Sequence, residues 1–282
     1  MKNHGFSKIT GLRKWVILAA VASMMSLAQT ARADPYDDAI DAYNQGDYAT
    51  ALKLLQPLAD QDDADAQTSL GEMYDSGEGV AQNFGEALKW YRLAAAQGDP
   101  DAQYDLGWMY ESGRGVERDY TEAMKWYRLA ASQGNPDAQT SLGEIYDNGE
   151  GVAQDFNEAL KWYRLAAGQD DADAQYDLGW MYDSGRGVAQ DSAEALKWYK
   201  RAALQDNADA QEALAEMYDS GDGVTKNALR AYMWYSLADP ASNPDAAAGL
   251  KGVAAKMNPA QIAKAQEMAE KCSASDFKDC GD

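Results

Sequence analysis

The feature that most constrains this sequence is a motif that returns every 36 residues. The first four copies carry the pattern A-Q-x-x-L-G-x-[MI]-Y-x-x-G-x-G-V followed by [ND]-x-x-E-A-[LM]-K-W-Y-x-x-A-A, and a fifth follows it in part. The Ala-Gln pair that opens it falls at 66–67, 102–103, 138–139, 174–175 and 210–211. A repeat of this length is a single supersecondary unit that cannot bury its apolar face alone, so successive copies must stack. The pattern therefore predicts one extended array and not several globular domains.

Each copy is predicted to form two helices. In the second copy Ala102, Leu106 and Tyr110 recur every four residues, which places them on one apolar stripe of a first helix. Two glycines then end that helix and turn the chain. Asp119 is expected to cap the second helix, with Glu122 three residues later as its reciprocal partner. The repeated unit is therefore a helical hairpin.

The pattern resembles the Sel1-like repeat, a relative of the tetratricopeptide repeat with a longer loop between its helices. The resemblance covers residues 64–243 as five copies of 36 residues. It implies an all-α, right-handed α-solenoid superhelix of helix-turn-helix hairpins, whose first helices line the concave surface. The fifth copy departs from the pattern, because Ala215 replaces the glycine of the first helix and residues 225–228 lack the Asp-x-x-Glu start.

The segments beside the array are predicted to cap it, because an uncapped solenoid exposes an apolar face. Residues 34–63 fit a shorter hairpin of the tetratricopeptide type, and residues 244–272 fit a C-terminal capping hairpin. A tail over residues 273–282 follows. Cys272 and Cys280 are expected to form a structural disulfide in an oxidising compartment.

Residues 1–33 have the three parts of a secretory signal peptide. A basic start precedes an apolar run over residues 15–28, and Ala31-Arg32-Ala33 supplies the small-x-small cleavage pattern. The run is shorter than the roughly 20 apolar residues of a membrane-spanning helix. The sequence thus predicts cleavage after Ala33, no membrane insertion afterwards, and a periplasmic or secreted protein.

The charge balance restricts the partners. Residues 34–282 keep 20 of the 25 Lys and Arg and all 46 Asp and Glu, a net charge of 20 − 46 = −26. Such a chain repels nucleic acid and anionic lipid and favours basic or neutral partners. The same charge also serves solubility alone. The one histidine, His4, lies in the predicted signal peptide, so the remainder has no imidazole.

The sequence predicts no cofactor, no metal site and no enzyme. The repeated Gly-x-Gly follows a helix and lacks the third glycine of a dinucleotide fingerprint, and the acidic loops lack the spacing of a calcium loop, although weak surface binding of calcium stays open. Ser275-x-x-Lys278 matches a β-lactamase-like nucleophile motif, but no partner motif accompanies it. A hydrolase is therefore the third and weakest hypothesis.

The tryptophans fall into two sets. One recurs at the Trp-Tyr pair of every second helix, which indicates packing between hairpins. Trp108 and Trp180 occur only in alternate copies, one helical turn after Tyr104 and Tyr176 on the polar face of the first helix. Three other copies have an acid where the second set has tryptophan: Glu72, Glu144 and Glu216.

These seven residues are the predicted partner-binding site, since isolated aromatics on a polar face often anchor interfaces. The alternative is that each tryptophan simply folds over a neighbouring repeat. Arg114 and Arg186 alternate with acids in the same loops, so charge pairing between adjacent loops is also expected.

The predicted function is that of a protein–protein interaction scaffold or adaptor. A peptide or protein partner, basic or amphipathic, binds the concave face, and the resemblance implies roles in envelope assembly, signalling regulation or host contact. Binding of a glycan or another envelope ligand is the alternative, because tryptophan and acidic side chains suit sugars as well. Fold alone does not decide between them.

Overall fold

The structure, a computed structural model, describes residues 35–280, so the predicted signal peptide lies outside the described residues. Within this range the chain forms fourteen α-helices and no strand. The helices are α1 (Pro35–Asn44), α2 (Tyr48–Ala59), α3 (Ala64–Ser76), α4 (Phe84–Ala96), α5 (Pro100–Ser112), α6 (Tyr120–Ser132), α7 (Pro136–Asn148), α8 (Phe156–Ala167), α9 (Ala172–Ser184), α10 (Ser192–Ala203), α11 (Ala208–Ser220), α12 (Ala228–Leu237), α13 (Pro244–Ala254) and α14 (Pro259–Ala274).

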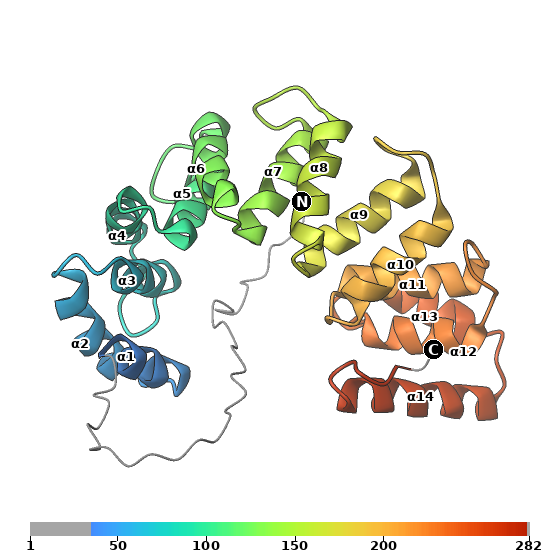
Figure 1. The fold of residues 1–282 in the computed structure, drawn as a ribbon. Helices are drawn as coiled ribbons and strands as arrows, with labels where there is room; N and C mark the ends of the chain where they lie inside the picture. The colour runs from blue at the N-terminus through green and yellow to red at the C-terminus, as the bar shows by residue number, and fades with distance from the viewer. Residues whose placement is uncertain (1–34, 281–282) are drawn as a thin grey trace, which may run out of the picture. The chain divides into compact units, whose positions relative to one another are not determined.

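The helices pack in the order of the chain. Each 36-residue copy forms one hairpin, from α3 with α4 to α11 with α12, and the second helix of each hairpin contacts the first helix of the next (Figure 1). Helices distant in the sequence make few contacts, as expected when stability comes from nearest neighbours. The prediction of an all-α repeat fold is confirmed.

Local sequence signals set the helix ends. The Asp99 side chain accepts a hydrogen bond from the Ala102 amide at the start of α5, and α5 ends at Gly113 in the left-handed conformation. The next glycine, Gly115, has a φ of +68°, and a Cβ there would lie 2.8 Å from the carbonyl oxygen of Phe84. The second loop glycine is therefore needed both for its backbone conformation and for close contact with the preceding hairpin.

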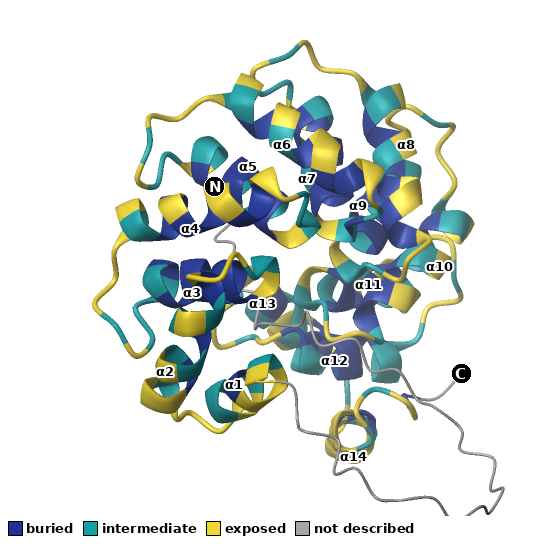
Figure 2. Cartoon of the chain, turned by 60° about the vertical axis from the view of Figure 1, so that its left-hand side comes forward, coloured by how far each residue is buried: buried dark blue, intermediate teal, exposed yellow. Residues whose placement is uncertain are grey.

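Buried residues lie where successive helices meet (Figure 2). The helix-interior glycine of each first helix lies under a tyrosine ring: a Cβ on Gly107 would be 2.5 Å from the ring of Tyr127. The fifth hairpin differs because Ala215 occupies this position, and the ring of Tyr235 lies against Gly249 of α13. A Cβ 2.5 Å from a ring is not tolerated, so the Tyr235 ring cannot lie as close to residue 215 as the other tyrosine rings lie to their glycines.

Buried glutamines connect the hairpins. The Gln103 amide donates to the carbonyl of Ala95 on the preceding helix, and its oxygen accepts from Gln133 at 2.9 Å. The same pairing recurs in four hairpins. In the fifth, Ala241 stands where the donor would be, and the buried Oε1 of Gln211 has no hydrogen-bond partner. The series of hydrogen-bonded glutamine pairs therefore ends with the fourth hairpin.

The C-terminal helices cover the last hairpin. We expected α13 and α14 to pack on each other as a hairpin, whereas each packs mainly against α12. Cys272 and Cys280 are joined by a disulfide, with their Cα atoms 4.3 Å apart, which holds the end of the tail against α14. None of the helices in residues 35–280 combines the length and apolarity that a membrane crossing requires.

Candidate functional site

A pocket of about 760 Å³ opens between the first helices α9 and α11 and reaches α13. Its aromatic walls are Tyr176 and Trp180 of α9, Tyr199 of α10 and Tyr235 of α12. The rest of the lining is mainly acidic: Asp183, Asp209, Glu212, Glu216, Asp219, Asp222 and Asp245. Its volume lies in the range of small-molecule sites and also admits one or two side chains of a bound peptide.

The pocket brings together three of the seven residues predicted from the sequence: Tyr176, Trp180 and Glu216. The other four, Tyr104, Trp108, Glu72 and Glu144, are half-buried residues of α3, α5 and α7 and do not line it. Tyr104 and Tyr176 hold equivalent places, each with its ring centroid 5.7 Å from that of a second-helix tyrosine.

Both alternate tryptophans stack against the arginine of their own loop. The Arg186 guanidinium carbon lies 4.1 Å from the centroid of the Trp180 ring and 5.4 Å from that of Phe156. Arg114 lies 4.2 Å from Trp108 in the same way. Cation–π contact explains why tryptophan and arginine recur together. Trp180 also lines the pocket, so the part of its indole that Arg186 leaves uncovered is available there.

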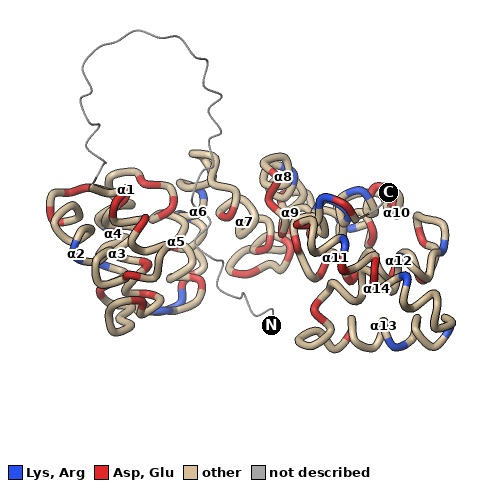
Figure 3. Tube along the Cα trace, turned by 90° about the horizontal axis from the view of Figure 1, so that it is seen from below, with Lys and Arg blue, Asp and Glu red and all other residues tan. Residues whose placement is uncertain are grey.

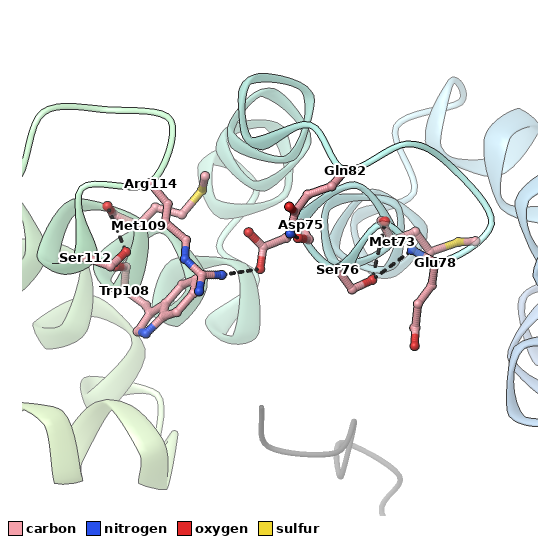
Figure 4. A network of polar contacts seen from close by, with 9 residues as sticks. All are labelled: Met73, Asp75, Ser76, Glu78, Gln82, Trp108, Met109, Ser112 and Arg114. Carbon is pink, nitrogen blue, oxygen red and sulfur yellow. Dashed lines mark hydrogen bonds and ion pairs between the residues drawn. The ribbon is translucent and has the colours of Figure 1, made fainter. Parts of the chain in front are cut away.

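Arg114 also makes an ion pair. One of its guanidinium nitrogens lies 3.6 Å from the Asp75 carboxylate, which belongs to the preceding first helix (Figure 4). We expected the loop arginines to pair with acids of adjacent loops, and for Arg114 the acid lies on helix α3 instead. The pair is mostly buried, and Arg114 lowers the pKa of Asp75 while burial, the larger effect, raises it.

The loop residue alternates between glutamate and arginine according to the first residue of the second helix in the preceding hairpin. Where that residue is tyrosine, the loop carries glutamate: the Tyr48 hydroxyl donates to Glu78 at 3.3 Å, and Tyr120 bonds Glu150. Where it is phenylalanine, as in α4 and α8, the loop carries an arginine that contacts the ring. The repeat therefore alternates in pairs because an aromatic residue and a loop residue must match.

Negative charge accumulates around the pocket. Burial, together with the neighbouring acids Glu212, Asp183 and Asp245, raises the pKa of Glu216. Burial also raises the pKa values of Glu212 and Asp183. One of the seven acids that line the pocket, Asp219, forms an ion pair within the described residues. The Lys256 ammonium nitrogen lies 3.0 Å from its carboxylate oxygen. The site therefore favours a cation.

A second concentration of acids surrounds Glu72 on α3. Burial raises the pKa of Glu72 to about 7, with Asp101, Asp99 and Asp75 contributing through their charges. Burial and the charge of Glu72 also raise the pKa of Asp105. Acidic residues recur along the trace from one hairpin to the next, with fewer Lys and Arg between them (Figure 3).

The sequence pattern did not indicate Asp183, Tyr199, Tyr235 and Asp245, which line the same pocket. Tyr199 and Tyr235 belong to the Trp-Tyr pairs that we assigned to packing alone. One available signal was the replacement of glycine by Ala215, which removes the usual seat of the tyrosine ring. In residues 35–280 no three His, Cys, Asp or Glu side chains are arranged to hold a metal ion. The arrangement suits noncovalent binding of an organic cation.

Comparison with known proteins extends the repeat assignment. The Sel1 repeat family matches residues 40–63, 64–99, 100–135, 136–171, 172–207 and 208–238. A Sel1 repeat protein from Oxalobacter formigenes is 33% identical with a TM-score of 0.74, over 84% of this chain and 99% of that chain. No curated protein matches the chain.

Two further solved structures are similar. A protective antigen of uropathogenic Escherichia coli, c5321, displays an SLR fold, is 34% identical and has a TM-score of 0.70. The match covers 87% of this chain and 54% of the antigen, so the similarity spans about half of that protein. The immunity protein Pa5087 of Pseudomonas aeruginosa is 24% identical with a TM-score of 0.51, over 72% of this chain and 83% of that chain, and shows likeness of fold alone.

Proposed function

Because this chain belongs to the Sel1 repeat family, whose members are generally protein-interaction scaffolds, we propose that it is an exported scaffold of the bacterial cell envelope. Its partner is a protein that presents a basic or amphipathic peptide segment to the surface formed by the first helices. Envelope assembly, signalling regulation and host contact are the roles that such a scaffold serves. The fold is typically non-enzymatic.

The pocket at Trp180 is the observation that supports this proposal. It places an indole and three phenols beside seven carboxylates, of which Asp219 is neutralised by Lys256. Aromatic side chains in a pocket anchor interfaces, and a group of carboxylates selects positively charged partners. A basic segment can therefore gain both burial and charge complementarity at this point.

The test uses two labelled peptides of equal length, one alternating Lys and Leu and the other alternating Glu and Leu. The full chain, purified after export, should bind the Lys peptide and not the Glu peptide. Trp180→Ala should weaken binding by about tenfold, because it removes a partly buried anchor. Trp108→Ala is the matched control, since it removes an equivalent indole outside the pocket, and circular dichroism checks that helicity is unchanged.

The proposal fails if both peptides bind equally, or if Trp180→Ala binds the Lys peptide as well as the unaltered chain does. The glycan hypothesis is tested in the same assay, because tryptophan and carboxylates also suit sugars. If envelope oligosaccharides displace the labelled peptide from the unaltered chain, but not from the Trp180→Ala variant, this result would favour a glycan ligand at the pocket.

Export is tested separately. Mass spectrometry of the protein from a fractionated bacterial host should find an N-terminus at Asp34 in the periplasmic or extracellular fraction, because signal peptidase cleaves after small-x-small sequences. Uncleaved protein in the cytoplasmic fraction would contradict the proposed localisation. It would not affect the proposed binding at the pocket of Trp180.

A further inference from the structure

The acidic pocket differs from the equivalent region beside Trp108. Both have a first-helix tyrosine whose ring lies tilted against that of a second-helix tyrosine, and both have a tryptophan covered by arginine. The next first helix differs, because α11 brings the carboxylate of Glu212 where α7 brings Thr140. Each side chain is hydrogen-bonded to the residue that caps the following helix: the Thr140 hydroxyl to Asp171 at 2.9 Å, and the Glu212 carboxylate, which accepts from the Asn243 amide. The chain thus contains a close internal comparison for the pocket.

The acid that follows the tryptophan also differs. In the hairpin of Trp108 the Tyr127 hydroxyl donates to Glu111 at 2.5 Å, so a phenol partly satisfies that carboxylate. In the hairpin of Trp180 the equivalent residue is the shorter Asp183, which lines the pocket together with Tyr199. Asp183 is one methylene shorter than Glu111, and its carboxylate is therefore available to a ligand.

The fifth hairpin supplies the remaining wall. Ala215 replaces the glycine on which the tyrosine rings of the regular repeats rest, and Tyr235 lies against Gly249 and lines the pocket. Asp245 of α13 completes the acidic rim. A pocket of this composition therefore forms where the regular array meets its C-terminal cap.

We propose that this pocket binds a ligand carrying two or more ammonium groups on an aliphatic chain, the chemistry shared by free polyamines and by neighbouring lysine side chains. The inference rests on the proposed function in that it names the chemistry by which a partner is anchored. The half-buried rings of Tyr176 and Trp180 favour an organic cation, since alkylammonium groups and their methylenes pack on aromatic rings, and the almost fully buried Tyr199 and Tyr235 lie behind them in the lining.

The number of carboxylates sets the charge of the ligand. Seven line the pocket and one is paired with Lys256, so a single positive charge leaves most of them uncompensated. The pocket volume of about 760 Å³ is far larger than a bare ion needs. Together, charge and size favour an extended polycation over an inorganic one.

The test measures binding of spermidine and of end-blocked trilysine to the exported full chain by calorimetry, with magnesium as a control for charge alone. Both amines should bind, and the double variant Glu212→Gln/Glu216→Gln should weaken them by about tenfold or more. Asp37→Asn/Asp38→Asn is the matched control, because it also removes two carboxylates, exposed ones of α1 that do not line the pocket, and it should change affinity by less than about twofold.

Two results would overturn the inference. One is an equal loss of affinity in Asp37→Asn/Asp38→Asn and in Glu212→Gln/Glu216→Gln. The other is displacement of spermidine by magnesium added at a concentration that supplies the same total positive charge. Either shows that the amines feel only the diffuse acidic surface. Tighter binding of spermidine than of trilysine identifies a free polyamine as the ligand, and the reverse order identifies a lysine-bearing segment.

The outcome is separable from that of the proposed function. If the amines bind in the pocket while Trp180→Ala leaves capture of the Lys/Leu peptide unchanged, the scaffold proposal fails and the amine site stands. If the peptide binds through Trp180 while neither amine binds or competes, the amine inference fails and the scaffold proposal stands.

Discussion

Replacing the glycine at the centre of a first helix should destabilise the array. A Cβ on Gly143 would lie 2.5 Å from Cε1 and 2.6 Å from Cδ1 of Tyr163, whose side chain is 1% exposed. Both contacts are with a rigid ring packed between hairpins, so the helices must separate or the ring must leave its rotamer. Such overpacking costs about 1–3 kcal/mol.

The gain in helix propensity opposes this cost. Alanine is better than glycine by up to about 1 kcal/mol inside a helix. The net expectation for Gly143→Ala is therefore a loss of up to about 2 kcal/mol, and each kcal/mol lowers the melting temperature of a chain of this size by about 2–4 °C. Thermal unfolding followed by circular dichroism at 222 nm measures it.

Two controls isolate the ring contact. Gly252→Ala in α13 introduces a methyl group with nothing within 4 Å, so it should raise stability by about 0.5–1 kcal/mol. In a Tyr163→Leu background, which removes the ring, Gly143→Ala should become stabilising. If Gly143→Ala in the unaltered chain raises the melting temperature as Gly252→Ala does, the reasoning is refuted.

Three further outcomes follow from named contacts. Arg186→Ala removes the guanidinium from the Trp180 ring, which should change tryptophan fluorescence and cost about 0.5–1 kcal/mol in thermal unfolding; unchanged emission would contradict the stacking. Burial raises the pKa of Glu72 to about 7, so the folded state holds this proton more tightly than the unfolded state, and stability should fall as pH rises from 5 to 8. Glu72→Gln should flatten that dependence and raise the melting temperature at pH 8, and a slope identical to that of the unaltered chain would count against it. Reducing the Cys272–Cys280 disulfide should lower the stability of α14 by about 2–3 kcal/mol, seen as faster amide hydrogen exchange in that helix while α3 to α10 exchange as before.

The repeat and its helices were predictable because they depend on short-range signals. Caps such as Asp99, loop glycines such as Gly113 and apolar stripes such as that of Leu106 act within a few residues of one another. Their recurrence every 36 residues then requires stacking, whichever side chains decorate the surface. The fold class therefore follows from the sequence.

The surroundings of the predicted site depended on contacts between hairpins. Sequence spacing put Trp108 and Trp180 on the polar face of their helices, but only the packed structure shows that loop arginines cover them and that Phe84 and Phe156 help to hold those arginines. The matching aromatic residue stands about thirty positions before its arginine, beyond the reach of helical periodicity.

The pocket likewise depends partly on the sequence pattern and partly on how the hairpins pack. The sequence by itself predicted that Tyr176, Trp180 and Glu216 occupy the polar faces of two successive first helices. The tertiary structure decided that Tyr235 joins them, because a methyl group on Ala215 denies its ring the seat that glycine provides in the regular repeats. Periodicity specifies what every repeat shares, whereas the shape of a site depends on where packing makes one repeat unlike the others.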